Sequence, residues 1–153
     1  LDYEEELLAR LDWVVASVHT SFGMSAEAMT RRVIAAIEHP LVDALGHPTG
    51  RLIERRGPYE LDLEAVFGAA AATGTLLEIN GNPRRRDLSE TNARAAVGAG
   101  ATLVIDSDAH RVSTLENMRW GVASARRGWV RREDVANTLP WERLRALRKR
   151  NRG

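Results

Sequence analysis

The sequence predicts an α/β fold with a mainly parallel sheet, and three observations support this prediction. Four short runs rich in Val, Ile and Leu show little polar alternation, which is typical of strands buried on both faces. Helical patterns separate these runs. Successive runs start about 30 residues apart, the length of a strand–helix–strand unit. Strands that alternate with helices favour a parallel sheet with right-handed crossovers.

The predicted strands cover residues 13–18, 41–45, 75–79 and 101–105. The first predicted helix follows the N-cap residue Ser25, and Met29, Val33 and Ile37 recur in it at helical spacing. A second helix runs from Leu61 to Gly74, because glycine favours a helix end. Further helices are expected at 89–98, 115–128, 133–137 and 141–150.

Length and composition exclude several classes of protein. The length of 153 residues suits one domain with a hydrophobic core. The formal net charge of +1 does not by itself indicate binding to nucleic acid. The absence of cysteine excludes disulfide frameworks, thiolate zinc fingers and a cysteine nucleophile. No apolar run approaches the roughly 20 residues that span a bilayer. We therefore expect no membrane partner and a cytoplasmic location.

The two ends of the chain carry their own expectations. Residues 148–153 are mostly basic, and we expect them to form a frayed, solvated tail. The chain starts at Leu1, without an initiator methionine and directly before a helical pattern. We therefore expect it to be a piece of a longer protein.

Three of the predicted strands carry ligand-type side chains at their carboxyl ends. His19 follows the first strand, His47 follows the second, and Asp108 and His110 follow the fourth. Because the carboxyl ends of parallel strands form one rim, these side chains are expected to converge. Nitrogen and oxygen ligands without thiolate suit Zn²⁺, Mn²⁺ or Fe²⁺. The alternative for each histidine alone is a hydrogen-bonded loop residue, and His39, at a helix end, is expected to be structural.

Three further residues are candidates for substrate binding. Arg51 lies four residues beyond His47 and suits bidentate capture of phosphate, although a surface salt bridge is equally open. Asn80 ends the third strand on the same face as Glu78, where it could orient a ligand or hold water. Of the three arginines at 84–86, we expect Arg84 to contact substrate and the other two to face solvent. No dinucleotide fingerprint, P-loop or nucleophile elbow is present.

Four segments resemble the later motifs of the PHP (polymerase and histidinol phosphatase) domain, in order and in spacing. They read Val-Ala-Ser-Val-His at 15–19, Asp-Ala-Leu-Gly-His-Pro-Thr-Gly-Arg at 43–51, Leu-Glu-Ile-Asn-Gly-Asn-Pro at 77–83 and Asp-Ser-Asp-Ala-His at 106–110. The segment 118–129 most resembles the PHP domain of bacterial family X DNA polymerases.

The resemblance implies the C-terminal part of a distorted (β/α)7 barrel, about four parallel strands with flanking helices, and up to three metal ions at the carboxyl rim. His19 and His47 match two histidines that share one metal with a bridging glutamate. Asp108 matches a carboxylate on a second metal and His110 a ligand of the third, both in catalytic roles. The implied reaction is metal-assisted hydrolysis of phosphoesters, with Mn²⁺ or Zn²⁺ as cofactor. In family X polymerases it is 3′-5′ exonuclease or DNA 3′-end processing, as in DNA repair.

The resemblance also has gaps. The family's first His-X-His motif, two further ligands and the bridging glutamate have no counterpart ahead of His19, so only four of the usual nine ligands are expected. Residues 1–153 would then form a partial PHP domain, because four strands cannot close a barrel. The expected partners are DNA 3′ ends or another phosphoester, an N-terminal PHP segment, a polymerase domain, and a second copy of the chain.

Three functions stay open on this basis. The first is a DNA-processing nuclease whose activity in this chain alone is weak or absent. The second is a small-molecule phosphatase of the histidinol phosphatase type. The third is a structural PHP module without catalysis. The upstream ligand motifs would separate the third from the first two.

Overall fold

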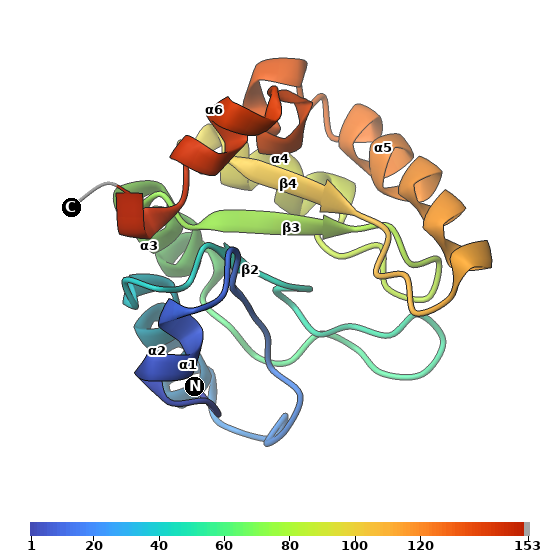
Figure 1. Cartoon of the computed structure of the whole chain (residues 1–153). Coiled ribbons are helices and arrows are strands. Elements are labelled where there is room, and N and C mark those ends of the chain that lie inside the picture. Colours follow the sequence, from blue (N-terminus) through green and yellow to red (C-terminus); the bar gives the residue numbers. More distant parts are fainter. Residues whose placement is uncertain (152–153) are drawn as a thin grey trace.

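The computed structural model describes residues 1–151 and contains one four-stranded parallel sheet. The strands are β1 (Val15–Ala16), β2 (Ala44–Leu45), β3 (Leu76–Asn80) and β4 (Leu103–Asp106), and they lie side by side in chain order (Figure 1). The predicted α/β class, with four parallel strands and flanking helices, is confirmed. The arrangement is compatible with part of a β/α barrel.

The first two strands are shorter than the sequence predicts. Only Val15 and Ala16 pair with Ala44 and Leu45, whereas β3 and β4 pair over four positions. β1 lies at an edge of the sheet, and Val15 is 50% exposed. A Val-rich run predicts a buried strand only where other segments cover it. Because β1 is an edge strand, it has a neighbouring strand on one side only, and Val15 stays half exposed.

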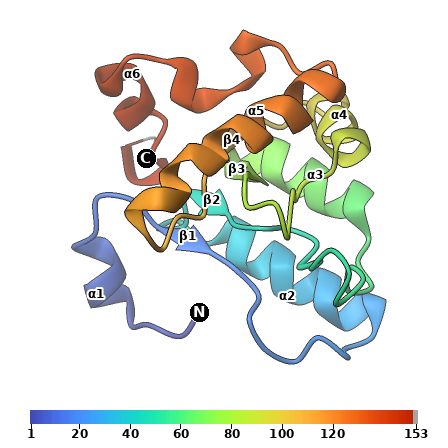
Figure 2. The same cartoon turned by 90° about the vertical axis from the view of Figure 1, so that its right-hand side faces the viewer.

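Three connecting helices pack against the sheet: α2 (Ala26–Glu38), α3 (Leu63–Thr73) and α4 (Glu90–Gly98) (Figure 2). Ser25 and Ser89 accept hydrogen bonds from the backbone N–H of Ala28 and Asn92, so both predicted N-caps are confirmed. The second helix starts two residues later than predicted because Asp62 caps it. The buried core between helices and sheet includes Met29, Val33, Ile37, Val66, Phe67, Leu77, Ile79, Ala93 and Leu103.

The remaining helices precede β1 or follow β4 in the chain. They are α1 (Glu5–Ala9), α5 (Met118–Arg127), α6 (Trp141–Ala146) and the 3₁₀ turns η1 (Val112–Asn117), η2 (Arg132–Asp134), η3 (Ala136–Thr138) and η4 (Lys149–Asn151). The helix predicted at 133–137 is thus replaced by the two 3₁₀ turns η2 and η3. The helix predicted at 141–150 is confirmed over Trp141–Ala146 and ends earlier than expected. Ala136, Leu144 and Leu147 pack with Ala44 and Leu76 in a second apolar cluster.

The β4 edge of the sheet is closed by a side chain. The Asn137 amide accepts a hydrogen bond from the N–H of Ile105 at 3.1 Å and donates one to the C=O of Ile105 at 2.6 Å. It therefore replaces a neighbouring strand at this position. Within residues 1–151, no helix is long and apolar enough to cross a membrane.

The expected frayed tail differs from the structure over residues 148–151. The Lys149 ammonium donates to the carbonyl oxygens of Ile37 and His39 at 2.6 and 2.8 Å, at the C-terminal end of α2. The buried Asp43 carboxylate accepts from the N–H of Lys149 at 3.1 Å, and Arg148 donates to the carbonyl of Asp12. A helix C-terminus and a buried carboxylate both attract cations, which explains the docking. Residues 152–153 lie outside the described part of the chain.

Candidate metal and phosphoester site

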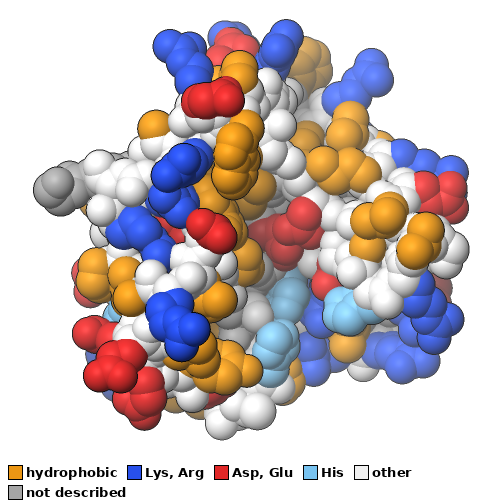
Figure 3. All heavy atoms as spheres, in the orientation of Figure 1, with side chains coloured by type: hydrophobic (Ala, Val, Ile, Leu, Met, Phe, Trp, Pro, Cys, Tyr) orange, Lys and Arg blue, Asp and Glu red, His pale blue; other side chains and the backbone are white. Residues whose placement is uncertain are grey.

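His19 and His47 come together at the carboxyl ends of β1 and β2. Their ring centroids lie 5.2 Å apart, and His47 is buried whereas His19 is exposed. The Nε2 atom of His19 lies 3.1 Å from the Ser17 hydroxyl. Figure 3 shows histidine side chains gathered around a hollow on this face of the molecule, with acidic side chains inside it.

The loop that carries His47 is attached to β3 by Glu78. The backbone N–H of His47 donates a hydrogen bond to the Glu78 carboxyl group, and the Asn80 amide donates to the same oxygen at 3.1 Å. Burial, followed by the hydrogen bond and the charge of Asp106, raises the pKa of Glu78 to about 9. The buried site therefore favours the protonated form of Glu78. In the sequence, Glu78 stands out only as the one acidic residue in the apolar run 76–79. That pattern alone does not assign Glu78 to the site.

The ring of His47 is neutral at physiological pH. Burial, with smaller contributions from the positive charges of Arg85 and His19, lowers its pKa to about 4. Its Nδ1 atom is buried and has no hydrogen-bond partner within residues 1–151. A neutral imidazole with an unpaired ring nitrogen is the form that binds a metal ion.

Asp108 and His110 form a second pair, beyond the end of β4. The His110 Nδ1 atom lies 3.8 Å from Asp108 Oδ1 and 2.9 Å from the Asp108 carbonyl oxygen, and His110 is exposed. Asp108 Oδ2 lies 3.4 Å from Arg85 Nε and 3.3 Å from the Asn82 amide nitrogen, which donates to it. The carboxylate is thus held between an imidazole and a guanidinium group.

The donor types fit Mn²⁺ or Zn²⁺, but the coordination shell is incomplete. Within the described residues 1–151, no three His, Asp or Glu side chains are placed to hold one metal ion. The four predicted ligands lie instead as two pairs, His19 with His47 and Asp108 with His110. Protein zinc sites use three or four protein ligands, so each pair supplies only part of a site.

Two of the predicted substrate-binding residues have their polar groups occupied within the chain. The Arg51 guanidinium donates to the backbone carbonyls of Arg85, at 2.8 Å, and of Arg86. Asn80 is fully buried, and its side-chain oxygen accepts from the N–H of Asn82 at 3.0 Å. Both residues therefore position the loop that follows β3. Arg84 has an exposed side chain and stays a candidate for substrate contact.

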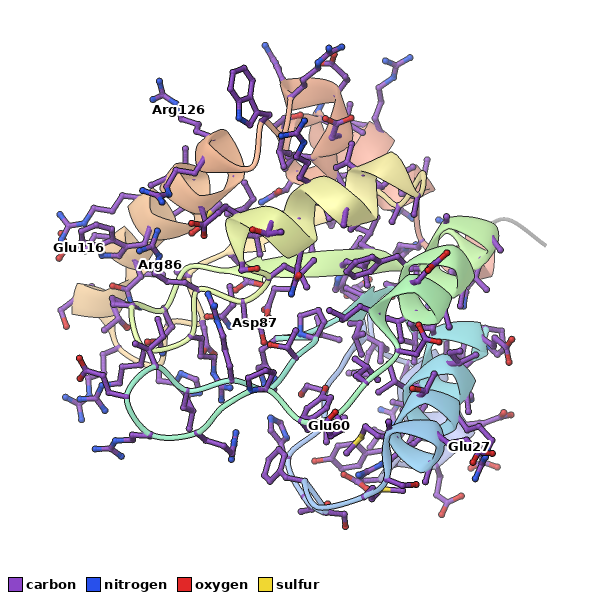
Figure 4. All side chains as sticks on the ribbon, turned by 180° about the vertical axis from the view of Figure 1, so that it is seen from behind. Glu27, Glu60, Arg86, Asp87, Glu116 and Arg126 are labelled. Atoms are coloured by element: carbon purple, nitrogen blue, oxygen red, sulfur yellow. The ribbon has the colours of Figure 1, made fainter. Side chains whose placement is uncertain are left out.

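The other two arginines of this loop do not face solvent, so that expectation was wrong. Arg85 forms the ion pair with Asp108, and its Nη1 atom is buried without a hydrogen-bond partner among residues 1–151. Arg86 donates to the Ser124 hydroxyl of α5 at 3.3 Å (Figure 4). Three consecutive arginines carry no signal that tells which one turns inward, because the acceptors lie 23 or more residues away.

Comparison with known proteins adds a direct test of the resemblance. No family model matches the chain. It is 41% identical over 151 residues, 99% of this chain, to the DNA polymerase/3′-5′ exonuclease PolX of Bacillus subtilis (strain 168). The resemblance to a bacterial family X polymerase is confirmed. This polymerase relative is much longer, and the aligned segment covers 26% of it.

Probable phosphatases are similar as well. One from Shewanella amazonensis is 35% identical over 98% of this chain, and one from Thermoanaerobacter sp. (strain X514) is 37% identical over 72%. The chain spans 61% and 46% of these two proteins. It therefore matches a segment of each relative, and the similarity to the polymerase and to the probable phosphatase of Shewanella amazonensis extends over nearly all of the chain.

Proposed function

We propose that the chain is part of a metal-dependent phosphoesterase that processes DNA 3′ ends, as a 3′-5′ exonuclease or a related activity. The names of the polymerase relative and the probable phosphatases support hydrolysis of phosphoesters. The single structural observation that carries the proposal is the buried, neutral ring of His47 beside His19, with an unpaired nitrogen.

In this proposal His19, His47, Asp108 and His110 hold Mn²⁺ or Zn²⁺. When bound, such ions supply an activated water and neutralise phosphate oxygens. Arg85 is proposed to bind the substrate phosphate, because its guanidinium lies beside the predicted ligand Asp108 and its side chain is partly exposed. Glu78 acts through His47, whose backbone it holds in place.

The two incomplete ligand pairs explain why the chain alone is proposed to hydrolyse phosphoesters weakly or not at all. Two donors leave most positions around a metal ion to water. A second segment or a second copy of the chain would then supply the remaining ligands. The exposed β1 edge, with Val15 half exposed, is a place where such a partner strand could pair.

The test is a hydrolysis assay with Mn²⁺ on a 3′-recessed DNA duplex and on histidinol phosphate, using the chain alone and the chain with a candidate completing segment. We expect DNA to be cleaved preferentially, with cleavage lost in His47→Ala and retained in His39→Ala. With the completing segment present and DNA cleaved by the unmutated chain, equal cleavage by His47→Ala would contradict the proposal.

A small-molecule phosphatase is the second candidate, and the probable phosphatase relatives favour it. In the same assay, preference for histidinol phosphate over DNA would select this function. Absence of hydrolysis of both substrates, together with absence of metal binding, would select a structural module.

A further inference from the structure

Trp129 is a large aromatic residue in an unfavourable backbone conformation. Its φ is +60°, and its side chain is 79% exposed. The N–H groups of Trp129 and Val130 bond the carbonyls of Arg126 and Ala125 at 3.2 and 3.0 Å, which closes the C-terminus of α5 in a Schellman motif. Glycine is the usual residue at this left-handed position, because a Cβ atom is disfavoured there.

Packing does not explain the tryptophan. The neighbouring Gly128 is required, since a Cβ atom there would lie 2.6 Å from the carbonyl oxygen of Glu90. Trp129 itself is mostly exposed to solvent. A residue that keeps an unfavourable conformation without burying its side chain suggests a role in binding.

Trp129 borders a depression of about 320 Å³ between the ends of α4 and α5. Arg94 and Arg131 line the same depression, together with Val97, Gly98, Gly128 and Asp134. The Asp134 carboxylate accepts a hydrogen bond from the N–H of Arg131 at 2.8 Å. The depression therefore combines one exposed aromatic side chain with two guanidinium groups and one carboxylate, whose oxygen is engaged by the Arg131 N–H.

Within residues 1–151, one of the two arginines that line the depression is unpaired, and the other forms only a weak exposed pair. In the part of the chain that the structure describes, Arg94 forms no ion pair. Arg126, which does not line the depression, extends outward from α5 (Figure 4). The Arg131 guanidinium lies 3.9 Å from Glu133, and both side chains are exposed. Exposed pairs of this kind are weak and leave the guanidinium accessible to another anion.

We propose that Trp129, Arg94 and Arg131 form a binding site for single-stranded nucleic acid. The indole face stacks on a base, and the guanidinium groups contact the neighbouring phosphates. Two accessible guanidinium groups beside an aromatic ring favour a polyanion with flat bases over an apolar protein surface. Stacking of this kind tolerates any base, so the site would select single strands without selecting sequence.

The test measures binding of a fluorescein-labelled oligothymidylate of about 12 nucleotides by fluorescence anisotropy. The buffer contains EDTA, so the result does not depend on metal or on hydrolysis. We expect Trp129→Gly to weaken binding about 10-fold. Its melting temperature should be unchanged or higher, because glycine relieves the backbone. Arg94→Gln should weaken binding and reduce the slope of log K against log salt by about 1.

The matched control is Trp141→Ala, which removes a tryptophan that is 57% exposed and lies outside the depression. It should bind the oligonucleotide like the unmutated chain. Equal affinities of Trp129→Gly and the unmutated chain would overturn the proposal. So would the absence of saturable binding by the unmutated chain below about 100 μM. Either failure would leave the proposed phosphoesterase function untouched, because that function is tested at the rim with metal present.

Discussion

The backbone N–H of His47 donates a hydrogen bond to the side chain of Glu78, which joins the ends of β2 and β3 at the candidate site. Because Glu78 also accepts from the Asn80 amide, one carboxyl group fixes two buried donors. The position of the His47 ring therefore depends on a residue that is itself no predicted ligand.

We expect Glu78→Ala to lower the free energy of unfolding by about 2 kcal/mol, because it leaves buried donors unpaired. Urea unfolding followed by circular dichroism measures this change. Glu60→Ala removes an exposed carboxylate and should change the free energy by less than about 0.5 kcal/mol. Similar stabilities of the two variants would contradict the role given to Glu78.

The positive charge of Arg85 makes protonation of His47 less favourable. Arg85→Gln should therefore raise the pKa of His47 above about 4, while burial keeps it below the ordinary value of 6.5. An NMR titration of the His47 ring protons measures the midpoint. Arg84→Gln removes an exposed arginine of the same loop and should leave the midpoint unchanged. If both variants shift the pKa of His47 by the same amount, the charge of Arg85 has no specific effect on His47.

Asp87 is fully buried and accepts a hydrogen bond from the N–H of Thr49 at 3.0 Å (Figure 4). Burial raises its pKa above the ordinary value of 3.8. Because the pKa of Asp87 is higher in the folded chain than in the unfolded chain, the folded state binds the proton more tightly. This stabilisation is fully present below the unfolded pKa, and it is lost as the pH rises through the folded pKa.

Asp87→Asn removes this titration. Its free energy of unfolding, measured relative to the unmutated chain by urea unfolding, should therefore increase from about pH 4 to pH 8. A difference that stays constant over this range would contradict the pKa direction assigned to Asp87.

Gly81 lies at the end of β3, where the backbone approaches two other segments. A Cβ atom there would lie 2.5 Å from the carbonyl oxygen of Asn117 and 2.7 Å from that of Asp106. We expect Gly81→Ala to lower the free energy of unfolding by about 1–3 kcal/mol.

Gly68 is the matched control for this prediction, because it lies on α3, where an added methyl group would meet no atom of a neighbouring segment within 4 Å. Gly68→Ala should raise the free energy of unfolding by up to about 1 kcal/mol, since alanine favours a helix interior. Thermal unfolding ranks the two variants, and a Gly81→Ala protein as stable as Gly68→Ala would be inconsistent with the close backbone approach.

The sequence predicts what depends on local pattern. Apolar runs separated by helical patterns indicate the parallel sheet, and Ser25 and Ser89 act as the predicted N-caps. The rule that parallel strands end at one rim places His19 near His47, and the structure shows the two rings together. The assignment of metal to these rings stays a prediction.

The remaining features depend on partners far away in the sequence. Arg85 turns inward because Asp108 lies there, and Lys149 docks because α2 ends beside it. Glu78 gains its position from the backbone N–H of His47, in the loop that follows β2. Such contacts have no local pattern, because burial and charge are set by the folded arrangement.

Metal binding by His19 and His47 is the central claim, and isothermal titration of the chain with Zn²⁺ and Mn²⁺ tests it most directly. The account predicts saturable binding of at least one of these ions. Binding should weaken at least about 10-fold in His19→Ala and in His47→Ala, and it should be unchanged in His39→Ala, whose ring lies at the end of α2. Identical affinity and stoichiometry in His47→Ala and the unmutated chain would contradict it.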